Sequence, residues 1–348
     1  MNFKIQSYFL ILISIVLLSC EKSNKKEVVT ISGRQILVNE IPYVIKGICY
    51  HPVPKGSDQR SFNNLSEDLA LMVEADINTI RVYEPIEEKA ILDEINAAGL
   101  KVIIGFGFNQ NGNFDILSGS FIDYINTYKN HKAILFWELG NEYNYHPEWF
   151  DGDIKNWYIA LNNAADLIHK TDKNHPVATA HGELPDEQAL LLAENIDVWG
   201  INIYRWDNPE SIFPEWSAAS SKPMYFSEAG ADSYMTISKD SYNQGLNERA
   251  QADATKKILK GAFSAPDICS GVTLFAFVDE LWKAGNNDML DPGGWAPNSS
   301  GVPYDGTPNE EYWGVVDIDR NKKEAYHIVK EIYKSVSHKS RSTRDLKP

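Results

Sequence analysis

The sequence predicts an α/β protein that folds as one (β/α)8 barrel, and three observations lead to this prediction. Eight short runs rich in apolar and β-branched residues alternate with longer helix-like stretches, which is the pattern of parallel βα units. The 348 residues, once an export segment is subtracted, match the length of a single barrel domain. Hydrophobic residues make up 43% of the chain, which is enough to bury a core of that size.

The eight runs are expected to be parallel strands with both faces covered, because several of them are apolar throughout. They span Tyr43–Tyr50, Thr79–Tyr83, Val102–Phe106, Ala133–Leu139, Val177–Ala180, Val198–Tyr204, Met224–Ser227 and Val272–Phe277. Helical patterns between them cover Leu65–Ala75, Glu87–Ala98, Phe121–Tyr128, Lys155–His169 and Asn247–Ala262. An open, doubly wound sheet is the alternative, but no glycine-rich phosphate loop follows the first run, which disfavours a nucleotide-binding version.

Local signals mark where several elements begin and end. Ser66 is expected to cap the first helix, and Gly99 stands where a glycine ends the second. The alternating stretch Val28–Val38, which contains Gly33, is expected to form a hairpin that closes the bottom of the barrel. The segment Asp279–Tyr312 is long and rich in Gly, Pro, Asn and Asp, so it is expected to wall a substrate cleft at the opposite end.

The first twenty residues are expected to be an export signal. Lys4 supplies a positive start, and Tyr8–Leu18 is an apolar run that is too short to span a bilayer well. The run closes with Leu17-Leu18-Ser19-Cys20, which resembles a bacterial lipobox. That resemblance implies cleavage before Cys20, lipidation of its thiol and a location in the bacterial cell envelope, at the outer membrane, held by the lipid alone. The alternative is an ordinary signal peptide with a chance cysteine.

The remaining chain is divided into three parts. Residues 21–30 are expected to be a flexible tether, residues 31–336 the barrel domain, and residues 337–348 a polar tail without fixed structure. Only Cys49 and Cys269 follow Cys20, and they form neither a disulfide framework nor a zinc motif. No metal ion or cofactor is predicted.

Composition narrows the class of partner. A net charge of −15 excludes nucleic acid as a partner, because the two polyanions would repel each other, and it favours a neutral substrate. Nine Trp and seventeen Tyr are many for this length, and aromatic rings suit the apolar faces of sugars, although most of them are expected to fill the core.

Two of the predicted strands end in glutamate. The fourth run is followed by Asn141-Glu142, and the seventh by Glu228. Reactive groups of a parallel barrel lie at the C-terminal ends of its strands, so these two carboxyl groups are expected to meet. Cleavage of a glycosidic bond needs such a pair: one group protonates the leaving oxygen, while the other attacks the anomeric carbon or activates water.

An Asn-Glu pair after strand four and a Glu after strand seven resemble the signature of the clan A glycoside hydrolases, which are retaining glycosidases on TIM barrels and include families 2, 5 and 72. The resemblance implies that Glu142 is the acid/base, that Glu228 is the nucleophile, and that Asn141 binds the 2-hydroxyl of the sugar. Without its partner, Glu142 would be read as a carboxylate that caps a helix.

Other segments extend the resemblance to roughly residues 36–333. Ile77–Tyr83 resembles the second strand of families 2 and 72, which implies that Arg81 orients the nucleophile and keeps it charged. The alternative for Arg81 is a structural ion pair with Glu138. Val198–Tyr204 resembles strand six, which implies a hydrogen bond from Tyr204 to the nucleophile.

The match has further parts and some departures. Trp282 stands just after the eighth strand, where clan A enzymes place a sugar platform. Trp137–Leu139 resembles family 5 mannanases, and Ile45–Ile48 resembles family 72 glucan transglycosylases. Ala229 follows Glu228 where families 2 and 72 often carry Tyr, and the sandwich domains of a full family 2 architecture are not expected before the barrel.

Polar and aromatic residues that follow other strand ends are further candidates for lining the cleft. His51, Asn109 and Trp206 are expected to bind substrate. The set also includes Tyr50, His181, Asp279, Glu280 and Lys283.

Together these features predict a glycosidase (EC 3.2.1.-) that acts by double displacement on a neutral poly- or oligosaccharide. The resemblances favour β-glucan, with β-1,3-glucan as the first choice, and β-mannan hydrolysis or glucan transglycosylation as alternatives. A non-catalytic glycan-binding lipoprotein is a different class, but it would be expected to lack one of the two glutamates. A solute-binding lipoprotein would need two lobes, whereas this chain shows one run of βα units.

Overall fold

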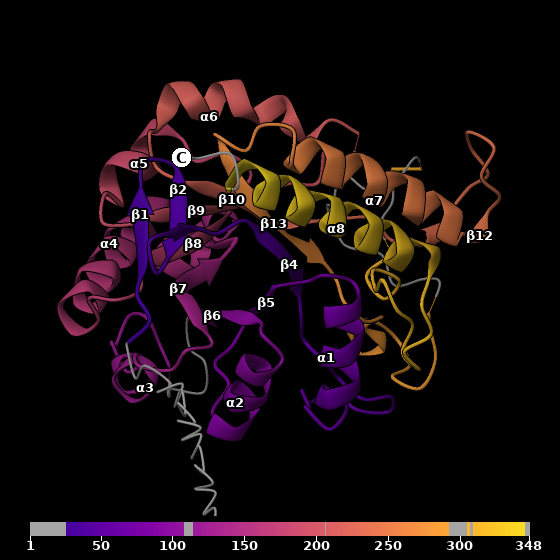
Figure 1. The fold of residues 1–348 in the computed structure, drawn as a ribbon, viewed down its shortest axis with the longest axis horizontal. Helices are drawn as coiled ribbons and strands as arrows, with labels where there is room; N and C mark the ends of the chain where they lie inside the picture. Colours follow the sequence, from indigo (N-terminus) through magenta and orange to yellow (C-terminus); the bar gives the residue numbers. More distant parts are fainter. Residues whose placement is uncertain (1–25, 108–113, 206, 292–304, 307–308, 345–348) are drawn as a thin grey trace, which may run out of the picture.

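The computed structural model describes residues 26–107, 114–205, 207–291, 305–306 and 309–344. Within them, eight parallel strands close into a barrel in the order β10-β13-β4-β5-β6-β7-β8-β9, which confirms the predicted TIM barrel (Figure 1). The barrel strands are β4 (Ile45–Cys49), β5 (Thr79–Val82), β6 (Lys101–Phe106), β7 (Ile134–Asn141), β8 (Val177–Gly182), β9 (Val198–Asn202), β10 (Met224–Gly230) and β13 (Cys269–Phe275).

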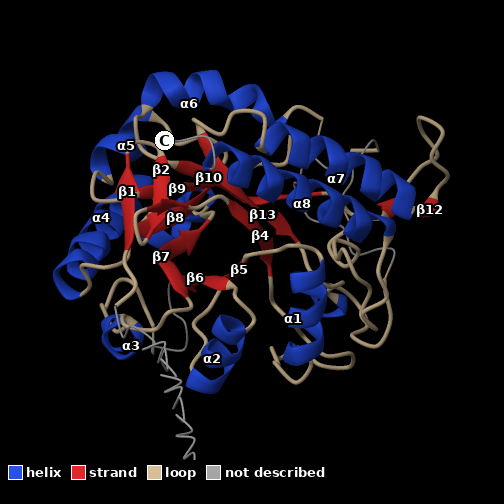
Figure 2. Cartoon of the chain, viewed as in Figure 1, coloured by secondary structure: helices blue, strands red, loops and turns tan. Residues whose placement is uncertain are grey.

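An α-helix follows every barrel strand, so the helices surround the barrel as an outer layer (Figure 2). The helices are α1 (Leu65–Glu74), α2 (Lys89–Ala97), α3 (Ile122–Tyr128), α4 (Ile154–Thr171), α5 (Glu187–Leu192), α6 (Phe213–Ala219), α7 (Glu248–Ala262) and α8 (Glu324–Arg344). The helical patterns named from the sequence did not include α5, α6 or α8.

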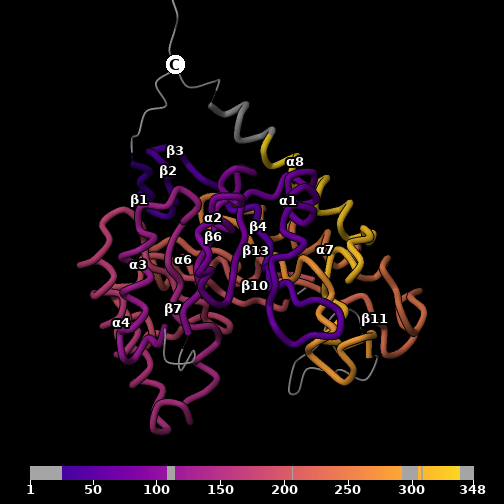
Figure 3. Tube along the Cα trace, turned by 90° about the horizontal axis from the view of Figure 1, so that it is seen from below, coloured from indigo at the N-terminus to yellow at the C-terminus, as the bar shows by residue number. Residues whose placement is uncertain are grey.

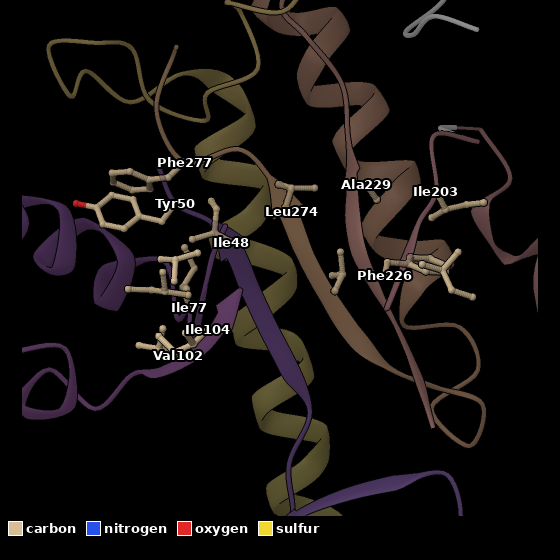
Figure 4. Close-up of a cluster of buried hydrophobic side chains, with 14 of the residues drawn as sticks. Ile48, Tyr50, Ile77, Val102, Ile104, Ile203, Phe226, Ala229, Leu274 and Phe277 are labelled. Carbon is tan, nitrogen blue, oxygen red and sulfur yellow. The ribbon is translucent and has the colours of Figure 1, made fainter. Parts of the chain in front are cut away.

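All eight predicted strand runs are confirmed, with ends that shift by a few residues. Each residue of β4, β5 and β9 is buried, as the continuous apolar pattern predicted for strands covered on both faces. The outward-facing side chains pack against the helices in one large hydrophobic cluster, and Figure 4 shows Ile48, Phe226, Ala229 and Leu274 among its members.

The predicted hairpin is also confirmed. Strand β1 (Val29–Ser32) pairs antiparallel with β2 (Gln35–Val38), which pairs with the short β3 (Ile41–Pro42), and Figure 3 shows the three together at one end of the barrel. Val29 and Ile36 join a separate cluster with residues near the beginnings of the barrel strands, so the hairpin closes the N-terminal end. Strand β1 begins at Val29, so residues 29 and 30, which were also assigned to the expected tether 21–30, belong to the hairpin.

Two of the expected helix ends have different outcomes. Ser66 lies inside α1, whose N-cap is Asn64, and its hydroxyl donates to Glu94 instead of capping the helix. The Ser66 prediction was therefore wrong, because a neighbouring helix offered the hydroxyl a carboxylate acceptor. Gly99 follows α2 with a φ of +83°, the left-handed conformation that glycine adopts without steric cost.

The C-terminal helix α8 corrects the expected tail. It packs beside α7 and runs to Arg344, so residues 337–344 are helical although their composition is polar (Figure 1). Polar residues do not end a helix by themselves, and the stretch contains neither Gly nor Pro before Pro348. Among the helices that the structure describes, none is both long and apolar enough to cross a membrane.

Candidate active site

Glu142 and Glu228 meet in a cavity at the C-terminal end of the barrel. The cavity has a volume of about 990 Å³, within the range of small-molecule sites. The residues that line it come from the C-terminal ends of barrel strands and from the segments that follow them: His51, Tyr83, Asn141, Glu142, Tyr145, His146, Glu183, Asn202, Tyr204, Glu228, Phe275, Glu280, Trp282, Lys283, Glu310 and Trp313.

Three donors hold the carboxylate of Glu228, which is only 6% exposed. Arg81 Nη1 and Tyr83 OH donate to Oε1 at 2.9 and 2.8 Å, and Tyr204 OH donates to Oε2 at 2.7 Å. These donors come from β5 and from the residues after β5 and β9, so the barrel closure brings them to Glu228 on β10. A carboxyl group held by a guanidinium and two hydroxyls is fixed in orientation, as a nucleophile must be.

Arg81 contacts both of its expected partners, the predicted nucleophile Glu228 and the structural partner Glu138. It is fully buried and donates to Glu228 and, through Nε at 2.7 Å, to Glu138, which is 1% exposed. Glu138 also accepts a hydrogen bond from Tyr225. Arg81 therefore makes both of the interactions that the sequence suggested. Glu138 anchors its guanidinium, and the guanidinium positions Glu228.

Asn141 ends β7, and its side chain is oriented by two donors. Its Oδ1 accepts from Arg81 Nη2 at 2.9 Å and from Asn202 Nδ2 at 3.1 Å. With the carbonyl oxygen occupied in this way, the amide nitrogen of Asn141 is the end that can donate to a sugar hydroxyl.

Glu142 follows directly, in a left-handed conformation with a φ of +57°. Such a backbone is strained for a residue other than glycine, and strain of this kind clusters at functional sites. The conformation is held by hydrogen bonds from Glu142 N to Ala180 O at 2.9 Å and from Tyr145 N to Glu142 O at 3.0 Å. These bonds place the side chain in the cavity at the end of the fourth barrel strand.

Glu142 is a weaker acid than an ordinary glutamate. Burial raises the pKa of Glu142 to about 7, and the negative charge of Glu228 adds to the shift, against the lowering effects of Asn202 and Arg81. Glu142 is therefore protonated in a large fraction of the molecules at neutral pH. A carboxyl group with a pKa near neutral suits a general acid that acts as a base in a later step.

This pKa gives a pH profile. The predicted acid role of Glu142 needs its protonated form, which dominates only below about pH 7, so kcat/KM for a substrate with a poor leaving group should fall about tenfold per pH unit well above that value. Glu142→Gln should remove this basic limb from whatever activity is left. Glu311 is a matched control: burial raises its pKa to about 7 too, but it does not line the cavity, so Glu311→Gln should keep the limb. A flat wild-type profile between about pH 6 and about pH 9 would contradict the assignment.

The wall after β13 carries the predicted platform and an ion-pair cluster. Trp282 lies in η4 (Leu281–Lys283) and packs on His51 with ring centroids 5.2 Å apart. Lys283 Nζ lies 3.0 Å from a carboxylate oxygen of Glu280 and 3.0 Å from one of Glu310. The described part of the long segment after β13 therefore does wall the cavity, as the sequence predicted.

Not every residue after a strand end reaches the cavity. Tyr50 is buried and donates to Asp68, His181 contacts Tyr158, and Asp279 pairs with Lys323 at 2.6 Å, so all three serve the packing of the barrel. None of the three lines the cavity. Cys20, Asn109 and Trp206 lie outside the described residues, and their expected roles stay predictions.

Several residues of the site were not predicted from the sequence. Tyr83 stands two residues after Arg81, and Asn202 two before Tyr204, so strand alternation would have placed them on the same faces as those candidates. Glu310 and Trp313 come from a distant loop, and no local pattern marks them. Among the described residues, no group of three His, Cys, Asp or Glu side chains is arranged to hold a metal ion.

A closed parallel barrel with glutamates at the ends of its fourth and seventh strands defines the class of the clan A glycoside hydrolases. Comparison with known families agrees: residues 29–256 match the family model described as "Glycosyl hydrolases family 2, TIM barrel domain". The chain belongs to this family, one of the three whose segments its sequence resembles.

The relatives are larger proteins. The chain is 24% identical over 294 residues to a β-glucuronidase of Paenibacillus borealis, an alignment that covers 74% of this chain and 46% of the relative. A family 2 β-galacturonidase of Eisenbergiella tayi bound to galacturonate has a similar fold, with a TM-score of 0.66 and 22% identity, covering 89% of this chain and 54% of that one. A β-glucuronidase of Faecalibacterium prausnitzii gives a TM-score of 0.67 and 20% identity, covering 89% and 52%. The chain thus spans about half the length of these relatives.

Proposed function

We propose that this protein is a retaining glycosidase that hydrolyses β-glycosidic bonds of a neutral poly- or oligosaccharide, with β-1,3-glucan as the first choice. The observation that carries the proposal is the pairing of a proton-holding Glu142 with a Glu228 carboxylate fixed by three donors in one cavity.

The mechanism is a double displacement. Glu228 attacks the anomeric carbon, and the bond from that carbon to the leaving oxygen breaks as Glu142 gives this oxygen its proton. Glu142, now ionised, takes a proton from water, whose oxygen attacks the anomeric carbon and releases Glu228. Asn141 donates to the sugar 2-hydroxyl in the transition state, and Arg81 keeps Glu228 in line. If a second sugar replaces water, the same intermediate yields a transglycosylation product.

The charge of the cavity favours a neutral sugar. Five glutamates line it, and among the described lining residues the one lysine, Lys283, is already paired with Glu280 and Glu310. Burial alone would lower the pKa of Lys283, but these two carboxylates raise it above the ordinary value, so the lysine stays charged and engaged. A uronate carboxylate would enter this field without a free cation and would be repelled.

A β-uronide is the second candidate, because the relatives above are named for glucuronide and galacturonide hydrolysis. Matched aryl β-glucoside and β-glucuronide substrates separate the two, together with β-1,3-glucan, β-mannan and their oligosaccharides. The neutral substrate should have the higher kcat/KM, by on the order of 100-fold or more, because like charges in a buried site cost several kcal/mol. Faster turnover of the glucuronide would overturn the neutral-sugar assignment and leave the two-glutamate mechanism standing.

We also propose that the mature protein is attached to the bacterial cell envelope, at the outer membrane, by a lipid on Cys20, which lies outside the described residues. The lipobox-like Leu17–Cys20 and the polar stretch after it support this proposal. Expression in a bacterium with labelled fatty acid should give a labelled protein in the membrane fraction, and Cys20→Ser should be unlabelled. Equal labelling of Cys20→Ser, or a wild-type protein found only in the soluble fraction, would contradict it.

A further inference from the structure

Aromatic side chains remain exposed beside the cavity, on the segment that joins β7 to α4. Tyr145 is 53% exposed and Trp149 is 42% exposed. The ring of His146 stacks on that of Trp149, with centroids 4.0 Å apart and planes inclined by 6°. Tyr145 and His146 both line the cavity. Apolar surface that stays exposed next to a cavity is typical of a surface that a ligand covers.

This aromatic surface is fixed in place before any ligand binds. Tyr145 ends the short turn η1 (Tyr143–Tyr145), and Asn144 in the same turn holds the end of β8 by two hydrogen bonds. Asn144 Nδ2 donates to Gly182 O at 3.0 Å, and Gly182 N donates to Asn144 Oδ1 at 2.8 Å. A Cβ on Gly182 would lie 2.2 Å from Cε2 of Tyr145, so the glycine leaves room for the tyrosine ring. A ring that is already ordered loses little entropy when it binds.

The surface lies at the acid end of the cavity. Tyr145 follows Glu142 by three residues, and its N–H donates to the backbone oxygen of Glu142. Burial, and then the charges of Glu142 and Glu183, raise the pKa of Tyr145 to about 12, which shows that both carboxyl groups are near. The three side chains that hold Glu228 come instead from the β5 and β9 strands and their ends. Because the acid protonates the leaving oxygen, the leaving group must lie beside Glu142.

A polar side chain follows Gly182, the residue that leaves room for the Tyr145 ring. Glu183 follows β8 and lines the cavity, and Arg205 fixes its carboxylate, with Nη2 donating to Oε2 at 2.7 Å. Glu183 has a left-handed φ of +58° and donates its N–H to Asn202 O at 3.1 Å. An oriented carboxylate next to an aromatic surface accepts hydrogen bonds from hydroxyls on the rim of a sugar whose apolar face covers the rings.

We propose that Tyr145 and His146, with Trp149 supporting the histidine, form a binding subsite for the sugar of the leaving group, and that Glu183 accepts its hydroxyls. The inference rests on the proposed function. It makes the natural leaving group another sugar rather than a small alcohol. The same subsite receives the acceptor sugar when the glycosyl-enzyme reacts with a carbohydrate instead of water.

Two substrates with the same sugar at the cleaved position test the subsite. One is an oligosaccharide, and the other is the β-glycosyl fluoride, whose leaving group has no contact with the rings. Tyr145→Ala and Trp149→Ala should each lower kcat/KM for the oligosaccharide about tenfold or more relative to the fluoride, because truncating an aromatic ring at a binding surface costs that much. Tyr145→Phe should keep the preference for the oligosaccharide. Leu191→Ala, a truncation on α5 at a residue that is 73% exposed, is the surface control.

Each outcome separates the subsite from the activity. An equal change of both substrates in the two alanine variants would overturn the subsite and leave the glycosidase intact. A wild-type protein that hydrolyses the fluoride but none of the oligosaccharides would do the same. A wild-type protein that hydrolyses neither substrate would remove the proposed function itself. A loss confined to the oligosaccharide, with transfer to added acceptor sugar reduced in the same variants, is the result we expect.

Discussion

Glu228→Ala is expected to lower kcat/KM by on the order of 10⁴-fold or more, because it removes the atom that forms the covalent bond to the sugar. The assignment rests on how Glu228 is held. It is 6% exposed, and its two carboxyl oxygens accept hydrogen bonds from Arg81, Tyr83 and Tyr204 at 2.7 to 2.9 Å. No other lining carboxylate that the structure describes is held by this arginine and two tyrosines.

Azide distinguishes loss of the nucleophile from loss of the fold. In Glu228→Ala the small anion can enter the space left by the carboxylate and attack the anomeric carbon of an activated aryl β-glycoside. Turnover should then return and yield a glycosyl azide of the opposite anomeric configuration. Glu187→Ala, an exposed substitution on α5, should retain activity without azide. An inactive Glu228→Ala that azide does not rescue, although it unfolds like the wild type, would argue against the nucleophile.

Arg81→Met is expected to have the largest effect on stability, a loss of about 3–5 kcal/mol in the free energy of unfolding. Arg81 is fully buried between two carboxylates, Glu138 and Glu228, and methionine would leave both without their cation. Activity should also fall, by on the order of 100-fold, because Glu228 loses the donor that aligns it. Urea unfolding and kcat/KM measure the two effects.

A double substitution shows whether the buried charge is the cause. Arg81→Met combined with Glu138→Gln should have a free energy of unfolding at least about 1 kcal/mol higher than Arg81→Met alone, because one of the two unpaired buried carboxylates is removed. Arg249→Met, at an exposed arginine on α7, is the matched control and should change stability by less than about 0.5 kcal/mol. An Arg81→Met protein as stable as this control would contradict the role of the network.

The barrel itself was predictable because each βα unit leaves a local mark. Alternation of apolar runs with helical patterns, and the glutamates after two of the runs, are visible without knowing any long-range contact. The contacts within the site that were not predicted have a common cause. The pairing of Lys283 with Glu310 and the donation from Tyr83 to Glu228 both depend on how segments that are distant in the sequence meet in the fold.

Some predictions for single residues were wrong because another residue in the fold binds the side chain. Ser66 carried a correct capping composition, yet Glu94 on the next helix accepts its hydroxyl. Tyr50 and Asp279 follow strand ends as cleft residues do, yet their side chains are buried, where they pair with Asp68 and Lys323. The polar composition after Ser337 gave no sign of the helix that continues there, because α8 is held by its earlier, buried turns.

The most direct test of the two-glutamate mechanism is to trap the glycosyl-enzyme. A 2-deoxy-2-fluoro glycosyl fluoride of the sugar that the protein turns over slows the second step more than the first, so the covalent intermediate accumulates. Protease digestion and mass spectrometry should then find one sugar on the peptide that contains Glu228, and none in Glu228→Ala. A sugar attached to a different carboxylate, or rapid turnover of the parent substrate with inverted anomeric configuration and no adduct, would contradict the account.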